Sequence, residues 1–289
     1  MKKILILGAS GMAGHVVYTI LDEYKKYEIL GTTNSNYFLE SNTVKLDIFN
    51  TDKLMYIIAD FKPDIIINCI GMLISASLHY PDKTIYTNAY FPNLLAKLSI
   101  EKNFKLIHIS TDCVFSGKTG NYTEHSIKDA TDVYGLSKSL GEIDDENNLT
   151  IRTSIIGPEL KNTGEGLFHW VMNQKNKIFG YNNNIWSGVT TIELAKFINF
   201  AIDNNLKGLV HLTNNIPISK FELLHLINKV HNLNLIISDK KDYKCNKSFL
   251  NTNKLITYIV SSYEEMILEQ LQFIKDRSDF YKHYSANLL

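Results

Sequence analysis

Short runs of branched apolar residues alternate, through the first half of the chain, with segments in which apolar residues recur every three or four positions. Runs of the first kind predict buried strands, and they lie at residues 3–7, 28–32, 43–46, 65–69, 105–109 and 150–153. Segments of the second kind predict amphipathic helices, as at Val16, Val17, Ile20 and Leu21. Strands that alternate with helices form βαβ units, so this half is expected to build a parallel sheet that helices cover on both faces.

The pattern loosens after about residue 156, where turn-forming glycines and a run of three asparagines at residues 182–184 interrupt it. Helical spacing returns at residues 223–230 and 262–274. We therefore expect an α/β protein with a doubly wound parallel sheet and a smaller C-terminal lobe. The sheet domain is expected to take residues 1–156 with a returning segment near 187–214, and the lobe residues 157–186 and 215–289.

The chain has 289 residues, 45% of them hydrophobic, which is enough for a substantial core without disulfides or metals. Its 30 basic residues balance 30 acidic ones, so the basic surplus that nucleic-acid binding needs is missing. Three widely spaced cysteines give neither a disulfide framework nor a metal-ligand spacing, and the scattered histidines form no zinc set. No apolar run reaches the roughly 18 residues of a membrane span, and the first run ends at Gly8, too early for an export signal. We expect a cytoplasmic protein that binds a small molecule, without metal, nucleic acid or membrane.

A glycine-rich segment follows the first predicted strand and leads into the first predicted helix. It reads Gly8-Ala9-Ser10-Gly11-Met12-Ala13-Gly14, a GxxGxxG spacing. Glycine allows a sharp turn, a close approach of the backbone to a pyrophosphate and tight packing of helix on sheet, while the helix N-terminus offers free N–H groups to phosphates. The segment predicts a dinucleotide site that uses Gly8, Ser10, Gly11, Met12 and Gly14.

The residues after the second predicted strand indicate which dinucleotide binds. NAD sites carry a carboxylate there for the ribose 2′-hydroxyl, whereas residues 31–35 contain none. Thr33, Asn34 and Ser35 offer hydroxyl and amide donors that would not repel a 2′-phosphate, which favours NADP. The arginine usual in NADP sites is also missing, so a neutral pocket that accepts both dinucleotides is the alternative.

Tyr134 and Lys138 lie one helical turn apart on the same predicted face. A nearby ammonium stabilises a phenolate, so Tyr134 is suited to pass a proton to a carbonyl oxygen while hydride reaches the carbon. Thr111 follows the fifth predicted strand, where a parallel sheet brings residues to its ligand crevice, and offers a second hydrogen bond to that oxygen. An exposed helix face is the structural alternative for the Tyr-Lys pair.

The glycine loop and four later motifs together resemble the extended short-chain dehydrogenase/reductase superfamily, and within it the branch of dTDP-4-dehydrorhamnose reductase. The motifs are Ile-Ser-Thr-Asp-Cys-Val-Phe-Ser-Gly at 109–117, Tyr-Gly-Leu-Ser-Lys at 134–138, Ile-Arg-Thr-Ser-Ile-Ile-Gly at 151–157 and Trp-Ser-Gly-Val-Thr-Thr at 186–191. The resemblance implies a Rossmann-type sheet, a lobe that holds a nucleotide-sugar, a homodimer, and a catalytic trio at Thr111, Tyr134 and Lys138. It also implies cofactor contacts from Asp47, Ile48, Cys69 and Gly71.

Cys113 follows Thr111 by two positions, where monofunctional reductases of this branch often have tyrosine. The bifunctional epimerase-reductases carry a cysteine there as acid/base, and among them the chain most resembles UDP-L-rhamnose synthase. A C4 ketone acidifies the protons on C3 and C5, and groups that polarise the ketone for reduction also stabilise the enolate. The resemblance therefore implies an epimerase role for Cys113, with a small buried hydrophobe as the alternative.

Inversion needs a second acid/base on the other face of the sugar ring. The resemblance places a His or Lys on the first helix of the lobe, expected at residues 167–176, with Lys175 preferred and His169 second. A solvated charge at a helix end is the alternative for Lys175. Asp112 is expected beside the substrate, and Trp186 is expected to stack on the nucleotide base or to anchor the lobe.

The resemblance thus implies an NADPH-dependent 3,5-epimerase/4-reductase that converts UDP-4-keto-6-deoxy-D-glucose to UDP-L-rhamnose. One alternative is a monofunctional nucleotide-sugar 4-ketoreductase. The other is a non-catalytic NADP-binding regulatory subunit, because fold alone does not imply activity.

Overall fold

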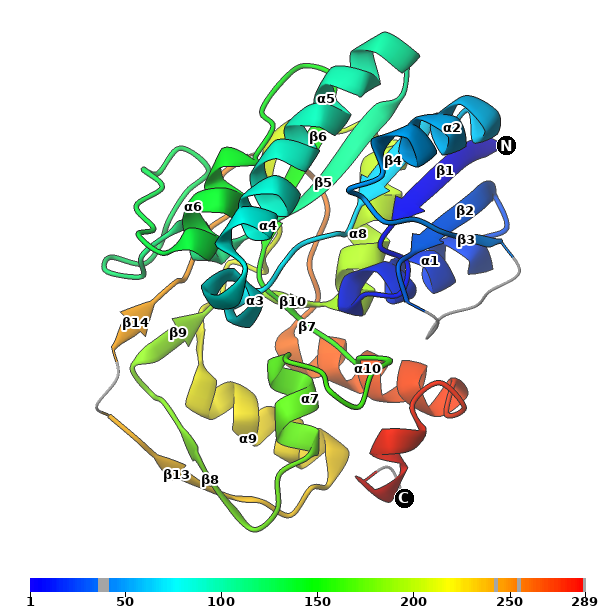
Figure 1. The fold of residues 1–289 in the computed structure, drawn as a ribbon. Helices are drawn as coiled ribbons and strands as arrows, with labels where there is room; N and C mark the ends of the chain where they lie inside the picture. The colour runs from blue at the N-terminus through cyan, green and yellow to red at the C-terminus, as the bar shows by residue number, and fades with distance from the viewer. Residues whose placement is uncertain (36–41, 242–243, 254–255, 288–289) are drawn as a thin grey trace.

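The computed structural model describes residues 1–35, 42–241, 244–253 and 256–287. A seven-stranded sheet runs through the larger domain in the order β11-β6-β5-β4-β1-β2-β3 (Figure 1). Each neighbouring pair of these strands is parallel. Their bounds are β1 Lys2–Leu7, β2 Tyr27–Thr33, β3 Thr43–Lys45, β4 Ile65–Asn68, β5 Lys105–Thr111, β6 Leu149–Thr153 and β11 Gly208–His211.

The six strands predicted from the sequence are confirmed to within two residues at each end. The seventh, β11, was not predicted as a strand, because four residues after a glycine give too short a pattern. Together with helix α8 (Thr191–Asp203) it returns from beyond residue 187 to the edge of the sheet, next to β6.

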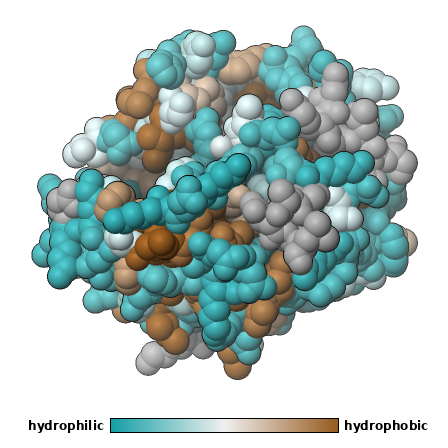
Figure 2. Space-filling view, turned by 90° about the horizontal axis from the view of Figure 1, so that it is seen from below, coloured by the Kyte–Doolittle hydropathy of each residue, from teal (hydrophilic) through white to brown (hydrophobic). Residues whose placement is uncertain are grey.

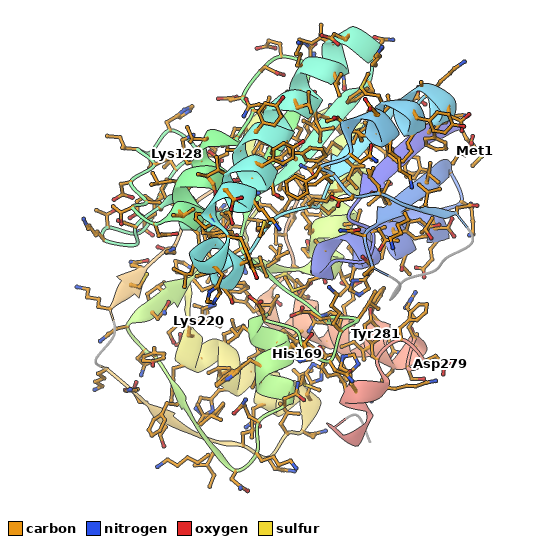
Figure 3. All side chains as sticks on the ribbon, in the orientation of Figure 1. Met1, Lys128, His169, Lys220, Asp279 and Tyr281 are labelled. Atoms are coloured by element: carbon orange, nitrogen blue, oxygen red, sulfur yellow. The ribbon has the colours of Figure 1, made fainter. Side chains whose placement is uncertain are left out.

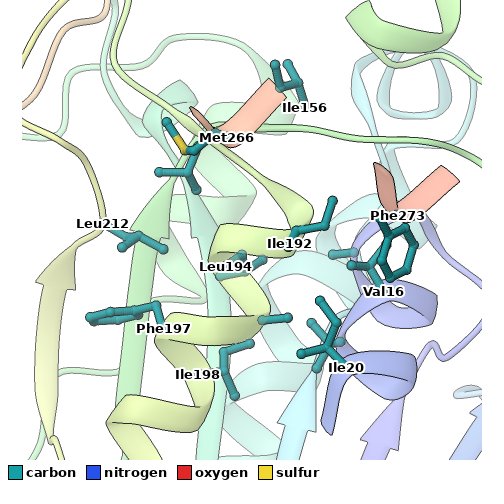
Figure 4. Close-up of a cluster of buried hydrophobic side chains, with 14 of the residues drawn as sticks. Val16, Ile20, Ile156, Ile192, Leu194, Phe197, Ile198, Leu212, Met266 and Phe273 are labelled. Atoms are coloured by element: carbon teal, nitrogen blue, oxygen red, sulfur yellow. The ribbon is translucent and has the colours of Figure 1, made fainter. Parts of the chain in front are cut away.

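Helices cover both faces of the sheet because successive side chains of a strand point to opposite sides. In β1, Ile4 and Ile6 pack with α1 (Met12–Glu23) and α8, whereas Leu5 and Leu7 pack with α2 (Thr51–Phe61) and α5 (Phe91–Lys102). Figure 4 shows the first of these layers, where Val16 and Ile20 of α1 meet Ile192 and Ile198 of α8. The expected doubly wound architecture is confirmed.

Between β4 and α5 the chain forms α3 (Ile74–His79), α4 (Pro81–Ile85) and a π-helical turn, η1 (Tyr86–Tyr90). After β5 it makes a 3-10 turn, η2 (Asp112–Val114), and a long loop before α6 (Val133–Leu140). These segments lie at the carboxyl end of the sheet, where the chain leaves β4 and β5.

The second lobe holds short strands and three helices on one side of the sheet (Figure 1). Helices α9 and α10 coincide with the predicted helical patterns, and each begins with a capping box, Ser219 with Glu222 and Ser262 with Glu265. Its elements are α7 Leu167–Met172, β8 Lys177–Gly180, β9 Asn184–Trp186, β12 Ile218–Ser219, α9 Lys220–His231, β13 Ile236–Asp239, β14 Cys245–Asn246, α10 Tyr263–Asp276 and η3 Lys282–Asn287. Two further short strands, β7 Ile155–Ile156 and β10 Val189–Thr190, pair with each other.

The helix predicted at residues 167–176 is shorter in the structure and ends at Met172. Asn173 turns its side chain back, and its Nδ2 donates to the backbone oxygen of His169 at 2.8 Å. Asn176 adopts a left-handed backbone with φ of 63°. Helices end where a side chain competes for a helical carbonyl or where a residue takes a left-handed backbone. The apolar spacing that predicted this helix contains neither signal.

The surface is mainly hydrophilic on the face seen in Figure 2, with hydrophobic residues in separate patches. Among the described residues, the structure contains no helix with the length and apolar character that a bilayer crossing requires.

Candidate active site

The sheet reverses its winding between β1 and β4, which are neighbours although the connections from them run to opposite sides. Ligands of open α/β sheets bind at such a switch point, outside the carboxyl ends of the strands. A cleft of about 520 Å³ lies there. Its walls come from the loop after β1, the ends of β4 and β5, helix α6 and the segment 153–166 of the lobe.

The glycine loop forms one wall of this cleft. Gly8 takes a left-handed φ of 80°, which turns the chain sharply out of β1. At Gly14 a Cβ atom would lie 2.1 Å from the backbone oxygen of Gly8, so the first turn of α1 approaches the loop too closely for a side chain. Ser10, Gly11 and Met12 line the cleft as predicted.

Three hydroxyls meet beside the loop at the end of β2. Thr33 Oγ1 donates to Ser10 Oγ at 2.7 Å, and Ser35 Oγ donates to the same atom at 3.1 Å. Among the described residues, no carboxylate takes part in this group. Asn34 is exposed next to it.

The remaining predicted cofactor residues divide into two pairs. Cys69 and Gly71, after β4, line the cleft next to the glycine loop. Asp47 is exposed, Ile48 is buried, and neither lines the cleft. The structure therefore places the second pair outside this cavity.

Thr111, Tyr134 and Lys138 come together on the wall formed by β5 and α6. Helix α6 can approach η2 because Gly135 has no side chain: a Cβ atom there would lie 2.4 Å from the backbone oxygen of Cys113. The Thr111 side chain lies near enough to the Tyr134 phenol to act on its pKa. Thr111 and Tyr134 thus line the same cleft.

Burial raises the pKa of Tyr134, with further contributions from Cys113 and Asp112 and an opposing one from its hydrogen bond to Thr111. The expectation that Lys138 lowers this pKa is wrong for the protein without ligands, since burial outweighs the favourable interactions. Tyr134 is therefore a neutral phenol that carries a proton to donate.

Lys138 is 4% exposed and has its Nζ between two groups of β5. It donates to the backbone oxygen of Ile109 at 2.7 Å and lies 3.4 Å from His108 Nε2. Burial lowers the pKa of Lys138 to about 8, against smaller raising effects of Glu142 and Cys69.

Cys113 lines the cleft next to Thr111. Burial, followed by the charge of Asp112, raises the pKa of its thiol to about 11, while a hydrogen bond with the Lys247 side chain acts in the opposite direction. The charge of Asp112 and Cys113 also influences Lys220, whose pKa burial lowers to about 8. Two lysines of the lobe thus face the Asp112–Cys113 turn.

Lys220 and Lys247 were not predicted from the sequence. Each is an isolated lysine outside any motif, more than 100 positions from Cys113 in the chain, so no local signal could have identified them. Lys220 also lies over the ring of Trp186, with its Nζ 5.1 Å from the ring centroid (Figure 3 labels Lys220).

Two predicted substrate residues lie elsewhere than expected, and a third, Trp186, takes the second of its two expected places. Lys175 is exposed beyond the end of α7 and does not line the cleft. His169 is buried on α7, where its Nδ1 lies 2.7 Å from the Tyr284 hydroxyl, and it faces the C-terminal segment (Figure 3). Trp186 is 2% exposed and packs on Tyr263 at 5.6 Å between ring centroids, so it anchors the lobe.

Among the described residues, no group of three or more His, Cys, Asp or Glu side chains is placed to hold a metal ion.

The parallel sheet, the glycine loop at its switch point and the adjoining Thr111, Tyr134 and Lys138 define a Rossmann-type protein with a short-chain dehydrogenase/reductase constellation. More particularly, the chain belongs to the RmlD substrate binding domain family, whose model matches residues 1–242. The family resemblance inferred from the motifs is confirmed at this level.

Two curated relatives differ in how much of the chain they cover. A dTDP-4-dehydrorhamnose reductase of Aggregatibacter actinomycetemcomitans is 35% identical over 144 residues, which is 49% of this chain and 46% of the relative. Methionine adenosyltransferase 2 subunit beta of Bos taurus is 25% identical over 248 residues, 80% of this chain and 73% of the relative. The chain thus spans about half the length of the first relative.

A crystal structure of dTDP-4-dehydrorhamnose reductase from Bacillus anthracis in complex with NADP has the same fold, with a TM-score of 0.80 and 23% identity. The superposition covers 95% of this chain and all of the other.

Proposed function

We propose that the protein is an NADPH-dependent 4-ketoreductase of a nucleotide-bound 4-keto-6-deoxyhexose. The observation that carries the proposal is that Thr111, Tyr134 and Lys138 line one cleft together with residues 10–13 of the glycine loop, with Lys138 one helical turn from Tyr134. The similarity to dTDP-4-dehydrorhamnose reductases supports it.

The residues present fit a dinucleotide. Gly11, Met12 and Ala13 line the cleft, so a pyrophosphate there can approach the backbone N–H groups at the start of α1. The Ser10, Thr33 and Ser35 hydroxyls, with no carboxylate among them, suit a 2′-phosphate, which supports NADP over NAD. The similar Bacillus anthracis structure contains NADP.

The bound cofactor would supply a hydride to C4 of the sugar. Thr111 and Tyr134 would hold the ketone oxygen between their hydroxyls, and Tyr134, which is protonated because burial raises its pKa, would transfer its proton to that oxygen. Lys138 would then return a proton to the tyrosine. These steps convert ketone to alcohol with one hydride and one proton.

Epimerisation by Cys113 is a second candidate activity, and one observation favours it: Cys113 lines the cleft beside Thr111. With its pKa raised to about 11, the thiol is an acid that can protonate an enolate carbon. Lys247 and Lys220 interact electrostatically with Cys113, whereas Lys175 does not line the cleft. For this candidate activity, the proposed substrate is UDP-linked and the proposed product is UDP-L-rhamnose.

Incubation of the protein with UDP- or dTDP-linked 4-keto-6-deoxyglucose and NADPH in D₂O tests both candidates. Oxidation of NADPH with a 4-alcohol as product supports the reductase, and deuterium at C3 and C5 supports epimerisation. If dTDP-4-dehydrorhamnose is reduced but C3 and C5 of the unepimerised sugar stay protonated, the enzyme is a monofunctional reductase. Cys113→Ala should abolish deuterium incorporation and retain reduction.

The rival is a binding subunit, as the similarity to methionine adenosyltransferase 2 subunit beta suggests. Tight NADP binding without oxidation of NADPH by any 4-keto sugar would favour that rival.

We also propose a homodimer through the face of α4, η1 and α6. Tyr90, Leu136 and Leu140 expose large apolar side chains there, and these elements contact one another. Light scattering of the wild type and of Leu140→Glu should give a dimer and a weakened dimer, respectively, and a wild-type monomer would contradict the proposal.

A further inference from the structure

Behind Lys138 the structure contains a row of three buried side chains from adjacent elements. Asn68 at the end of β4 and His108 in β5 are direct partners in the register of the two parallel strands. Asn68 and His108 are fully buried, and Lys138 reaches His108 from α6. These contacts are not predictable from the sequence, because both strand positions fall within runs that predict buried strands.

The backbone fixes the orientation of the Asn68 amide. The N–H of Ile70 lies 3.1 Å from Asn68 Oδ1. A backbone N–H can only donate, so the atom that faces it must be the amide oxygen. The amide nitrogen, Nδ2, is therefore the atom that faces His108 Nδ1, at 3.1 Å.

The orientation of Asn68 in turn fixes the tautomer of His108. An amide NH₂ group has only protons to offer, so Nδ1 of His108 must accept and carry no proton. The neutral ring then carries its proton on Nε2. An imidazolium would place a second N–H against the amide protons, and burial beside Lys138 lowers the pKa of His108 well below its usual value in agreement with a neutral ring.

Nε2 of His108 lies 3.4 Å from Nζ of Lys138. An N–H that faces an ammonium meets another donor, whereas the lone pair of a neutral amine accepts it. The amine also retains a proton for its 2.7 Å bond to the Ile109 oxygen. We propose that Asn68 and His108 are positioning residues that hold an N–H toward Lys138 and thereby stabilise its neutral amine over its ammonium.

Three other titratable groups around Lys138, namely Cys69, Glu142 and Tyr134, do not stabilise its neutral amine. Burial raises the pKa of the Cys69 thiol, at the end of β4, to about 12, so it is uncharged. Glu142, after α6, is a carboxylate that favours the ammonium, but Arg152 holds it through two hydrogen bonds. Tyr134, one turn earlier on α6, is neutral. The His108 N–H is thus the polar contact that favours the amine.

The catalytic consequence of this inference rests on the proposed function. A lysine that gives up its proton readily is suited to restore the proton that Tyr134 transfers to the sugar oxygen: the N–H bond of Lys138 breaks, the O–H bond of Tyr134 forms, and the amine left behind accepts the N–H of His108. Solvent then reprotonates the amine.

The tautomer is measured on the unliganded wild-type protein. Long-range ¹H–¹⁵N NMR of ¹⁵N-histidine-labelled protein, with the His108 ring assigned through its backbone, should show an unprotonated Nδ1 and a protonated Nε2 at neutral pH. The opposite tautomer, or an imidazolium, would overturn the proposal.

The effect on Lys138 is measured by following its ¹⁵Nζ signal across pH in lysine-labelled protein. Asn68→Leu removes the amide protons without adding charge, so His108 is free to turn its lone pair toward Lys138, and the titration midpoint should rise by roughly one unit. If burial alone lowered this midpoint, the more apolar leucine would leave it unchanged or lower it, and either result would overturn the proposal. Asn199→Leu, which loses the bond of Asn199 to the Tyr27 hydroxyl at the far end of the sheet, is the matched control and should leave the midpoint unchanged.

The pH profile of NADPH oxidation provides an independent measurement. In the Asn68→Leu variant, the part of the pH–rate profile that follows the ionisation of Lys138 should move to higher pH by the same amount as the NMR midpoint. Because both NMR measurements use protein without substrate, they stand if the reductase reaction is absent. A tautomer and midpoint as expected without any turnover would refute the proposed function and leave the Asn68–His108 pair supported.

Discussion

The Glu142 carboxylate binds the Arg152 guanidinium through two parallel hydrogen bonds, Nε to Oε1 at 2.8 Å and Nη2 to Oε2 at 2.6 Å, with both side chains only 1% exposed. Ser110 Oγ donates to the same carboxylate at 2.7 Å. The pair joins the end of α6, which carries Tyr134 and Lys138, to β5 and β6. It therefore fixes the helix of the proposed site against the strand that carries Thr111.

Glu142→Gln should destabilise the protein by about 3–5 kcal/mol, because it leaves a buried guanidinium without its carboxylate. Urea denaturation measures this loss. Glu28→Gln is the matched control: Glu28 pairs with Lys3 on the surface, where an ion pair contributes about 0–1 kcal/mol. Equal effects of the two changes would show that the buried pair contributes no more than an exposed one.

Tyr134→Phe should lower kcat for the reduction of a 4-keto sugar by roughly 10²–10⁴-fold, because it removes the proton donor. NADPH affinity and thermal stability should change little. Tyr56→Phe, at an exposed position of α2, is the control for the loss of a tyrosine hydroxyl. A Tyr134→Phe enzyme with wild-type kcat would exclude Tyr134 as the donor.

The glycine loop and the trio were predictable because each is a local pattern. A strand followed by GxxGxxG determines where α1 begins, and a four-residue spacing determines that Tyr134 and Lys138 share a face of α6. The parallel sheet then brings Thr111 to the same edge. For these residues, sequence separation and strand order are sufficient.

The contacts made by side chains from distant segments were not predictable. Asn68 and His108 meet through the register of β4 and β5. A sequence pattern that predicts buried strands does not show whether a polar residue within it has a hydrogen-bond partner. Lys247 and Lys220 reach Cys113 only because the lobe folds back over the turn after β5. Lys175 was placed by assuming four further helical residues, and the helix ends before it.

Gly14→Ala should abolish NADP binding and destabilise the fold, because its Cβ would lie 2.1 Å from the Gly8 oxygen and 2.8 Å from the Gly8 carbonyl carbon. Both atoms are backbone, so the loop itself must move. Gly71→Ala is the control for stability, since its Cβ would meet Asn88 Oδ1 at an ordinary 3.6 Å. Thermal unfolding with and without NADP measures both effects, and a Gly14→Ala protein that NADP stabilises as it does the wild type would contradict the loop's assignment.

His231 is 3% exposed in α9, its ring packs on Phe168 at 5.1 Å between centroids, and neither ring nitrogen has a hydrogen-bond partner among the described residues. Because an unsatisfied buried polar group costs about 1–3 kcal/mol, His231→Leu should stabilise the protein by a similar amount.

The same residue makes stability depend on pH. Burial lowers the pKa of His231 from 6.5 to about 4, so the unfolded chain binds a proton between these values and the folded chain does not. Stability therefore falls as the pH drops from 6.5 toward 4, and it is insensitive to this residue above 6.5. His231→Leu should flatten that slope relative to the wild type in urea denaturation across this window, although His15 and His211, also with pKa values lowered to about 4, keep part of it. A wild-type slope retained in full by His231→Leu would show that His231 already titrates in the folded protein as it does in the unfolded chain.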